Sequence, residues 1–317
     1  METSPVNKIH ESRGFPRIFL LFIAFVVSFA AVTAFAAEES RQGEDLLFDI
    51  YQGNRARLAV NSFGLPLFLD SSERDGKVQV DVYGVFDYPL GSIVDALKVP
   101  ANWCDIVSLH PNIKACTNRE VAGAWLLTFY LGKKTYQSPE ETRQVKYHYR
   151  NVVQQQGYLD ITLNADAGPY GTRDHRMRFE ALPLDGGKTF VHVSYAYSDS
   201  VALRLAAKIY FATLARSMVG FSVIGTDSNS KPIYIGGPRG AVERTAVRFY
   251  FAIQSLMNTL RHPEENRFSM RISEWYNLTS RYGKQLLDMG KKDYLTFKTK
   301  EQKNQVILQR QIDSSLQ

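Results

Sequence analysis

The chain has 317 residues, 44% hydrophobic and 22% charged, which is enough apolar sequence for a full-sized core and too mixed for a disordered or collagen-like polymer. Two cysteines exclude a disulfide-dense mini-scaffold, and six histidines without metal-ligand spacing argue against a metal site. The formal net charge of +6 is small for this length, so we expect no nucleic-acid partner, because nucleic-acid binders concentrate far more Lys and Arg on one face.

The N-terminal segment predicts export. Residues 18–37 carry no charge, follow a basic stretch and end at Ala34, Phe35 and Ala36. This is the layout of a secretory signal peptide, here residues 1–36, with small residues where signal peptidase reads the chain. We therefore expect cleavage near Ala36 and a periplasmic or secreted mature protein. The alternative is an uncleaved N-terminal helix that anchors the protein, because about twenty apolar residues can just span a bilayer.

The first elements of the mature chain are a strand and a short helix. Residues 37–76 read as an irregular N-terminal extension, because Gly and Pro interrupt its short apolar runs. From Lys77 to Val82 apolar and polar residues alternate, which is the signature of a half-buried strand. Apolar residues recur at helical spacing over 90–97, with Pro89 at the start, so a short helix is expected there.

The two cysteines are expected to form one disulfide. Cys104 and Cys116 lie twelve positions apart, and an oxidising compartment lets such a pair close. In the chain-entropy model this bond stabilises the fold by about 3 kcal/mol, chiefly by restricting the unfolded state. The alternative, a reactive Cys104, lacks both a Cys-x-x-Cys pair and a nearby activating cluster.

Residues 106–200 alternate between apolar and polar in several runs that Gly-, Pro- and Asp-containing turns separate, as an antiparallel meander requires. The last run, 188–197, is apolar or aromatic on both faces, so this strand is expected to be covered on both sides.

A strongly apolar helix is expected next, over 201–219. Its only charges are Arg204, Lys208 and Arg216, which share one sector of a helix. Such a helix is suited to lie on an anionic membrane with these three residues as the contact. The alternative is a buried helix whose basic residues point to water or pair with carboxylates.

Three further segments complete the chain. Residues 240–260 predict a second long, amphipathic helix, and a third is expected from about Phe268 to Met289. A lysine-rich tail follows from Lys291, either as a membrane contact or, more commonly, as a solvated end. We place residues 263–317 in a C-terminal helical extension with this basic tail.

The order of these elements predicts an α+β fold. A strand, short helical segment, run of antiparallel strands and long amphipathic helix together resemble the START-like superfamily, whose helix-grip fold curls an antiparallel sheet around its C-terminal helix. The resemblance covers 77–262 and rests on element order. Three features depart from it: export with a disulfide, the extra helix over 201–219, and the extensions at both ends.

The resemblance implies an apolar cavity and a hydrophobic small molecule or lipid as the partner, because a sheet wrapped around a helix is only partly filled by side chains. Large apolar and aromatic side chains on the predicted strands and helix are the candidates for the cavity wall, although all of them would also suit an ordinary core. These candidates are Trp125, Leu127, Phe129, Tyr147, Tyr149, Phe179, Tyr195 and Phe249.

No catalytic residue or cofactor is predicted, because the chain lacks the usual hydrolase, metalloprotease and nucleotide-binding motifs. The segment from Gly236 to Gly240 is read as a turn, with an anion site at a helix N-terminus as the alternative. His175 is read as structural, since acid–base work would need a partner from elsewhere in the fold. Two other functions stay open: an enzyme acting on a hydrophobic substrate in the same cavity, and a non-catalytic envelope scaffold with a filled core.

Overall fold

The structure, a computed structural model, describes residues 43–153, 157–213 and 216–315. The chain divides into two compact units, Met1–Leu46 and Leu47–Gln317. Of the first, only residues 43–46 are described, and they are helical. The expected signal peptide and its cleavage site therefore lie outside the described residues. Within the described ranges, no helix is both long enough and apolar enough to cross a membrane.

The second unit combines strands and helices in an α+β arrangement. Its strands are β1 (Leu67–Arg74), β2 (Lys77–Phe86), β3 (Ile113–Val121), β4 (Ala124–Leu131), β5 (Arg143–Val153), β6 (Leu159–Ala167), β7 (Arg173–Leu184), β8 (Lys188–Ser198), β9 (Val223–Thr226) and β10 (Pro232–Tyr234). After a helical segment over 47–53, its α-helices are α2 (Arg55–Ala59), α3 (Leu90–Leu97), α4 (Pro100–Val107), α5 (Val201–Ala212), α6 (Gly237–Thr259), α7 (Glu264–Ser280), α8 (Gly283–Leu286) and α9 (Lys291–Ser314).

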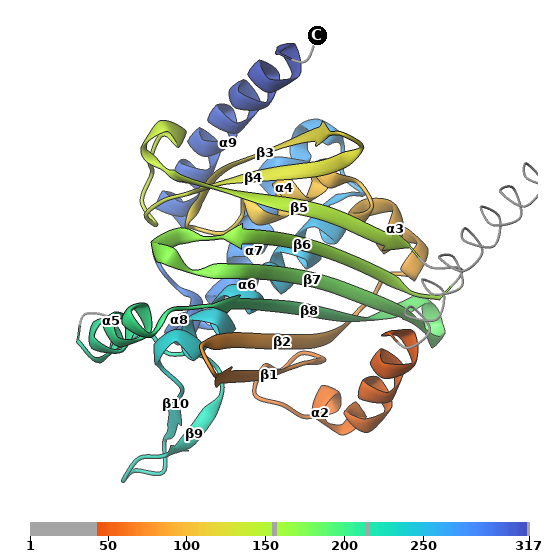
Figure 1. The fold of residues 1–317 in the computed structure, drawn as a ribbon. Helices are drawn as coiled ribbons and strands as arrows, with labels where there is room; N and C mark the ends of the chain where they lie inside the picture. The colour runs from red at the N-terminus through yellow and green to blue at the C-terminus, as the bar shows by residue number, and fades with distance from the viewer. Residues whose placement is uncertain (1–42, 154–156, 214–215, 316–317) are drawn as a thin grey trace, which may run out of the picture. The chain divides into compact units, whose positions relative to one another are not determined.

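Eight strands form one sheet in the order β1-β2-β8-β7-β6-β5-β4-β3, and every neighbouring pair is antiparallel. The chain crosses from β2 to the far edge through α3 and α4, and then returns strand by strand until β8 pairs with β2 (Figure 1). The strand expected from Lys77 is confirmed as β2, and the meander expected over 106–200 is confirmed as β3 to β8.

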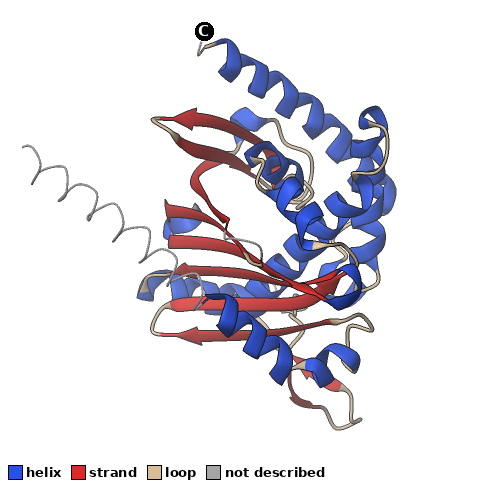
Figure 2. Ribbon diagram, turned by 90° about the vertical axis from the view of Figure 1, so that its right-hand side faces the viewer, coloured by secondary structure: helices blue, strands red, loops and turns tan. Residues whose placement is uncertain are grey.

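Helix α6 lies against one face of this sheet, which we call the inner face. It packs on β1, β2 and β8, and α4 and α7 pack on it in turn. Figure 2 shows the sheet and these helices as two layers. Helix and strand come closest at Gly84 of β2, where a Cβ atom would collide with the Tyr250 hydroxyl of α6. The main core fills the space between the layers.

A smaller core covers the opposite, outer face. Residues 47–59 contribute Leu47 and Leu58, which pack with Phe68, Tyr83 and Phe190 of β1, β2 and β8. Side chains from β8 therefore enter both cores, as the expectation of a strand covered on both sides requires.

The N-terminal part of the sheet starts earlier than the sequence indicates. Residues 67–74, assigned to the irregular extension 37–76, form β1 and pair with β2 along its full length. A tight turn with Asp75 and Gly76, both at positive φ, joins the two strands. The run Leu67 to Leu69 is buried while the rest of β1 is mostly exposed, so the strand lacks the regular alternation on which the prediction relied.

The C-terminal helices also differ from expectation. The predicted helix from Phe268 to Met289 is two helices, because α7 ends at Ser280 and α8 begins at Gly283. The basic tail is not a solvated end: residues 291–314 form α9, which packs along β3.

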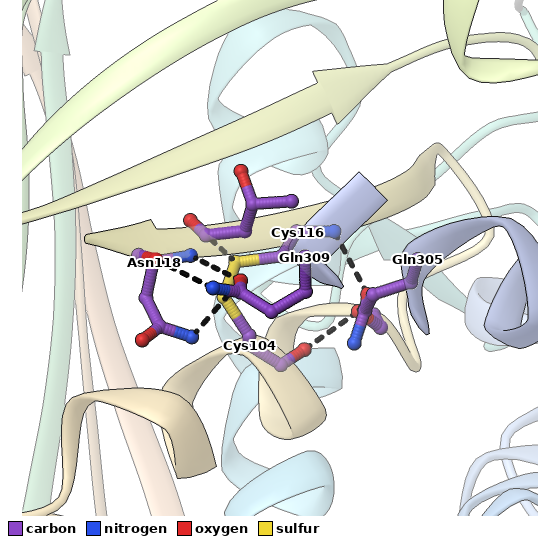
Figure 3. Close-up of a disulfide and its surroundings, with 7 residues drawn as sticks. Cys104, Cys116, Asn118, Gln305 and Gln309 are labelled. Carbon is purple, nitrogen blue, oxygen red and sulfur yellow. Dashed lines mark hydrogen bonds between the residues drawn. A yellow bond between two sulfur atoms is a disulfide. The ribbon is translucent and has the colours of Figure 1, made fainter. Parts of the chain in front are cut away.

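Helix α9 covers the edge of the sheet with polar side chains. The Gln305 Oε1 atom accepts the Cys116 N–H at 2.8 Å, and Gln309 accepts from the Asn118 N–H at 2.9 Å and donates to the Asn118 carbonyl at 2.8 Å (Figure 3). These side chains pair backbone groups of β3 that an exposed edge would leave open to another chain. The expected disulfide between Cys104 and Cys116 joins α4 to the same strand.

A buried charge cluster fixes α9 deeper in the protein. The Glu301 carboxylate lies 2.8 Å from the Nζ atoms of both Lys114 and Lys298, and all three side chains are at most 4% exposed. Lys298 also donates to the His110 and Ile113 carbonyls, and Lys114 donates to the Pro111 carbonyl. Burial lowers the pKa of Lys298 to about 8, against the opposing effect of Glu301. Every charge in this cluster has an ion-pair partner, although the Glu301 Oε2 atom makes no hydrogen bond among the described residues.

Candidate functional site

The eight predicted wall residues meet on the inner face, six buried and two half-buried. In the register of β4 and β5, Trp125 lies opposite Tyr149 and Leu127 opposite Tyr147. The complete set, Trp125, Leu127, Phe129, Tyr147, Tyr149, Phe179, Tyr195 and Phe249, belongs to the main core or packs against it. None of the eight lines either of the two large pockets described below. A role for this set in ligand binding stays a prediction.

These eight residues line neither large pocket partly because α4 packs against the strands that carry them. The Trp103 ring lies 6.5 Å from the Tyr149 ring and 6.4 Å from that of Phe179, centroid to centroid. The Trp103 indole N–H and the Tyr149 hydroxyl both donate to the Leu97 carbonyl, at 2.8 and 3.1 Å. A tryptophan that satisfies its polar atom in this way packs as core.

His175 is held among aromatic residues at one end of this core. Its ring nitrogens lie 3.1 Å from the Tyr195 hydroxyl and 2.7 Å from that of Thr172. Gly168 leaves room for the ring, because a Cβ atom there would collide with it. Burial lowers the pKa of His175 to about 4, so the imidazole is neutral near pH 7. With both nitrogens engaged by hydroxyls, His175 suits a structural role, as predicted.

A pocket of about 780 Å³ opens beside this end of the sheet, and we call it the basic pocket. Its walls come from the loop after α4, the β4–β5 and β6–β7 connections, α5, and the N-terminal half of α6. Five cationic side chains and a single carboxylate, Glu141, are among its lining residues. The cations are Lys133, Lys134, Arg143, Arg244 and Arg248.

Two of these cations are buried on the same face of α6. Arg244 and Arg248, one helical turn apart, are 8% and 4% exposed. Arg248 donates to Asp288 at 2.7 Å and to the Leu286 carbonyl at 3.3 Å, but its Nε atom has no acceptor among the described residues. For Arg244 the described residues offer no hydrogen-bond acceptor, and its buried Nη1 atom is unpartnered. Burial and the neighbouring Arg248 lower the pKa of Arg244 to about 10.

His110 adds a neutral donor to the same pocket. Its Nδ1 atom accepts the Asn112 N–H at 3.1 Å, so the ring proton belongs on Nε2. The Nε2 atom is buried and has no partner among the described residues. Burial, together with the charges of Arg248 and Lys298, keeps the pKa of His110 well below its usual range. The imidazole therefore stays neutral, and its Nε2–H is a buried donor without an acceptor among the described residues.

Helix α5 forms one wall of the pocket. Its exposed side chains are mainly apolar, whereas the sequence predicted an exposed basic stripe. The helix ends at Ala212, so Arg216 lies beyond it, and Arg204 is bound to Asp199 at 3.1 Å. The position of the Lys208 side chain lies outside what the structure describes. The exposed stripe is apolar instead: Val201, Leu205 and Ile209 are 78%, 62% and 60% exposed. The predicted helix over 201–219 was too long, so Arg216 does not share a helical face with Arg204, which pairs with a carboxylate as the alternative expected. A membrane contact through the three basic residues stays a prediction.

The β9–β10 hairpin also exposes apolar residues and lies toward the same end of the sheet (Figure 1). Val223, Ile224 and Ile233 are each at least 44% exposed. The base of the hairpin is held by Glu243 of α6, which accepts the N–H groups of Phe221 and Ser222 at 2.6 and 2.9 Å. Glu243 is thus engaged by backbone groups and forms no ion pair with Arg244, although its charge partly offsets the lowering of the Arg244 pKa.

The predicted turn from Gly236 to Gly240 leads into α6. Gly237 has a positive φ of 66°, and the helix begins there. Arg239 donates to the Ser71 hydroxyl at 2.6 Å rather than pointing at an open site. Gly236 is the N-cap and residues 237–240 form the first turn of α6, so the prediction of a plain turn before the helix was wrong.

A second pocket, of about 900 Å³, lies between the end of β2, α6 and α7. Its polar side chains largely pair with one another: the Tyr88 hydroxyl donates to Asn258 at 2.8 Å, and Asn258 donates to Glu274 at 2.8 Å. Gln254 Oε1 is buried there without a partner among the described residues. This pocket lacks the concentration of buried cations that marks the basic pocket.

A separate charge network is buried in the outer face of the sheet. His192 contacts Glu180 at 2.7 Å and Asp81 at 2.9 Å, and Arg178 pairs with Glu180 and Asp160. Burial alone would lower the pKa of His192, but the hydrogen bonds to Asp81 and Glu180 outweigh it and raise the pKa. Because its charges are partnered, this network suits a structural role.

Comparison with known proteins adds likenesses of fold only. No family model and no curated protein matches the chain. Among solved structures, it is similar to human StAR-related lipid transfer protein 5, at 10% identity over 57% of this chain and 93% of that one, with a TM-score of 0.29. Norcoclaurine synthase from Thalictrum flavum is 13% identical over 44% and 80%, with a TM-score of 0.31. An aromatase/cyclase from Streptomyces sp. R1128 is 10% identical over 39% and 70%, at 0.27.

TM-scores this low carry no argument by themselves. The fold assignment rests on the strand order and on the long helix α6 held against the inner face of the sheet. On these two observations the chain has a START-like helix-grip fold.

Proposed function

We propose that the protein binds or transfers a hydrophobic ligand such as a lipid, and that it exchanges this ligand at a membrane surface. The observation that carries the proposal is the basic pocket at one end of the helix-grip fold, bordered by the apolar stripe of α5. Exposed apolar side chains in a row are costly in water and are typical of a surface that contacts a membrane or partner.

The charges near the pocket favour a membrane as the partner of this surface. Lys133 and Arg143 line the pocket and are exposed, and Lys134 is half-buried. Basic groups beside an apolar helix are attracted to anionic lipid headgroups while the apolar side chains enter the interface. In this arrangement α5 contacts the membrane through Val201, Leu205 and Ile209 and not through Arg204, which is bound to Asp199.

A vesicle assay tests this contact. Ile209→Asp should weaken co-sedimentation with vesicles of phosphatidylglycerol and phosphatidylcholine and slow the transfer of a fluorescent lipid between them. Ile307→Asp is the matched control, because Ile307 of α9 is 54% exposed against 60% for Ile209. Equal binding and transfer by both variants would contradict the membrane contact. Absence of lipid uptake by the wild-type protein would contradict the proposed function itself.

Export is part of the proposal and rests on the sequence. The uncharged run over 18–37 and the site at Ala36 support removal of residues 1–36, and the Cys104–Cys116 disulfide suits an oxidising compartment. N-terminal sequencing of the protein from its envelope fraction should begin at Ala37. A retained Met1 would instead support the anchored form.

A further inference from the structure

We propose that the basic pocket binds the anionic head of an amphiphile, a phosphate or carboxylate group that carries an apolar chain. The proposal rests on the function proposed above and narrows its ligand to one chemical class. Arg244, Arg248 and His110 would bind the anion, and the apolar lining on the α5 side would contact the chain.

Three buried hydrogen-bond donors belong to side chains that line the basic pocket and have no acceptor in the described part of the chain. Arg244 Nη1, Arg248 Nε and His110 Nε2 are all buried and unpartnered among the described residues, and all three side chains line the same pocket. A buried donor without an acceptor loses its hydration without compensation, and a buried cation loses more. Three such groups around one pocket indicate an acceptor that is not part of the protein.

The nearby carboxylates that the structure describes do not accept hydrogen bonds from these three donor atoms. Asp288 is the partner of Arg248, and it also binds Lys134 at 2.5 Å. Glu243, next to Arg244 in sequence, is engaged by Phe221 and Ser222. Glu141 lines the pocket but is exposed. The excess of positive charge at the buried end of the pocket therefore remains.

Part of the lining of the basic pocket is apolar. Leu131, Tyr210, Phe211 and Met218 line the pocket together with the cations. A volume of about 780 Å³ lies within the range of small-molecule sites, so the pocket has room for an anionic head and part of a chain. The remaining chain would leave along α5, whose exposed stripe begins beside Tyr210. A free inorganic anion would use the cations but leave this apolar lining unused.

Calorimetry with short-chain lipids tests the inference. The probes are dihexanoylphosphatidylglycerol, dihexanoylphosphatidylcholine and inorganic phosphate, each titrated into the full mature protein. We expect the anionic lipid to bind about tenfold or more tighter than either of the others, because only it satisfies both the cations and the apolar lining. Arg244→Met should remove this preference, and Arg310→Met is the matched control, because Arg310 is exposed on α9.

Each outcome decides between sources of the anion. Equal binding of inorganic phosphate and the anionic lipid would overturn the amphiphile and leave a free-anion site. Equal binding of both lipids by wild type and Arg244→Met would overturn the anion site while leaving the proposed function intact. Loss of lipid uptake in every form would instead contradict the proposed function.

Discussion

Two groups of buried charge in this protein differ in one respect. Around α9, the carboxylate of Glu301 forms ion pairs with both Lys114 and Lys298, and both ammonium groups also donate to backbone carbonyls. In the basic pocket, Arg244 has no acceptor within the described residues and Arg248 is only partly satisfied. Burial alone therefore does not mark a binding site. A charge that finds an ion-pair partner within the protein is structural, whereas one that is left unpaired points to a ligand.

The largest effect should follow from breaking the paired group. Glu301→Gln leaves two buried ammonium groups without a counter-charge, so we expect the free energy of unfolding to fall by about 3–5 kcal/mol. Urea denaturation measures this change, with the exposed Glu265→Gln as the control. A loss within about 1 kcal/mol of the control would mean that the cluster is not structural.

Removing the disulfide is a second way to test how strongly the contacts of β3 stabilise the fold. Replacing Cys104 and Cys116 with serine removes the link between α4 and β3. We expect a loss of about 3 kcal/mol in unfolding free energy, because the unfolded chain regains its loop entropy. The same lipid affinity should be retained below the unfolding transition, since neither cysteine lines the basic pocket. A weakened affinity for dihexanoylphosphatidylglycerol would contradict the separation of the two regions.

A smaller effect is expected where α9 covers the sheet edge. Gln305→Ala leaves the buried Cys116 N–H without its acceptor, which should cost about 1–3 kcal/mol of unfolding free energy. Gln311→Ala, at an exposed position of the same helix, supplies the comparison. Similar stabilities for the two variants would show that α9 does not protect this edge.

The outer-face network predicts a pH dependence. The raised pKa of His192 means that its contribution to stability is full below the ordinary histidine range and is lost as pH rises through the folded pKa. The lowered pKa values of Asp81 and Glu180 give the opposite limit, with stability lost as pH falls through their folded pKa values. Wild-type protein should therefore lose more stability than His192→Gln as the pH rises above about 6.5, the ordinary pKa of histidine. If the free energy of unfolding of wild type and of His192→Gln changed equally with pH, this would contradict a charged imidazole at His192.

Much of the fold was predictable from sequence because the spacing of apolar residues indicates most of its strands and helices. The alternation in β4 and β5 correctly predicted which residues share one face of the sheet, and helical spacing predicted α6. Helix α9 was missed because its buried stripe is polar, with Lys298, Glu301 and Gln305 among its members, and such residues in a linear sequence are typical of a solvated surface.

The basic pocket was missed for a related reason. Charged residues on a predicted amphipathic helix are typical of its solvated side, so the sequence did not single out Arg244 and Arg248. The signal that was present was their spacing of one turn, on a helix that is buried almost all round in the structure. His110 comes from a distant loop, so only the folded chain brings it to them. The sequence favoured aromatic residues as the site, but most of these pack the core, because α4 inserts Trp103 among them.

The central claim is that Arg244 is kept buried and unpaired for an anionic ligand. The most direct measurement is the thermal unfolding midpoint of wild type, Arg244→Met and Arg310→Met, with and without dihexanoylphosphatidylglycerol. Without lipid, Arg244→Met should be as stable as wild type or more stable by up to about 2 kcal/mol, because an uncompensated buried charge is removed. The lipid should raise the midpoint of wild type and Arg310→Met but not that of Arg244→Met. A destabilised Arg244→Met whose midpoint the lipid raises as much as that of wild type would contradict the claim.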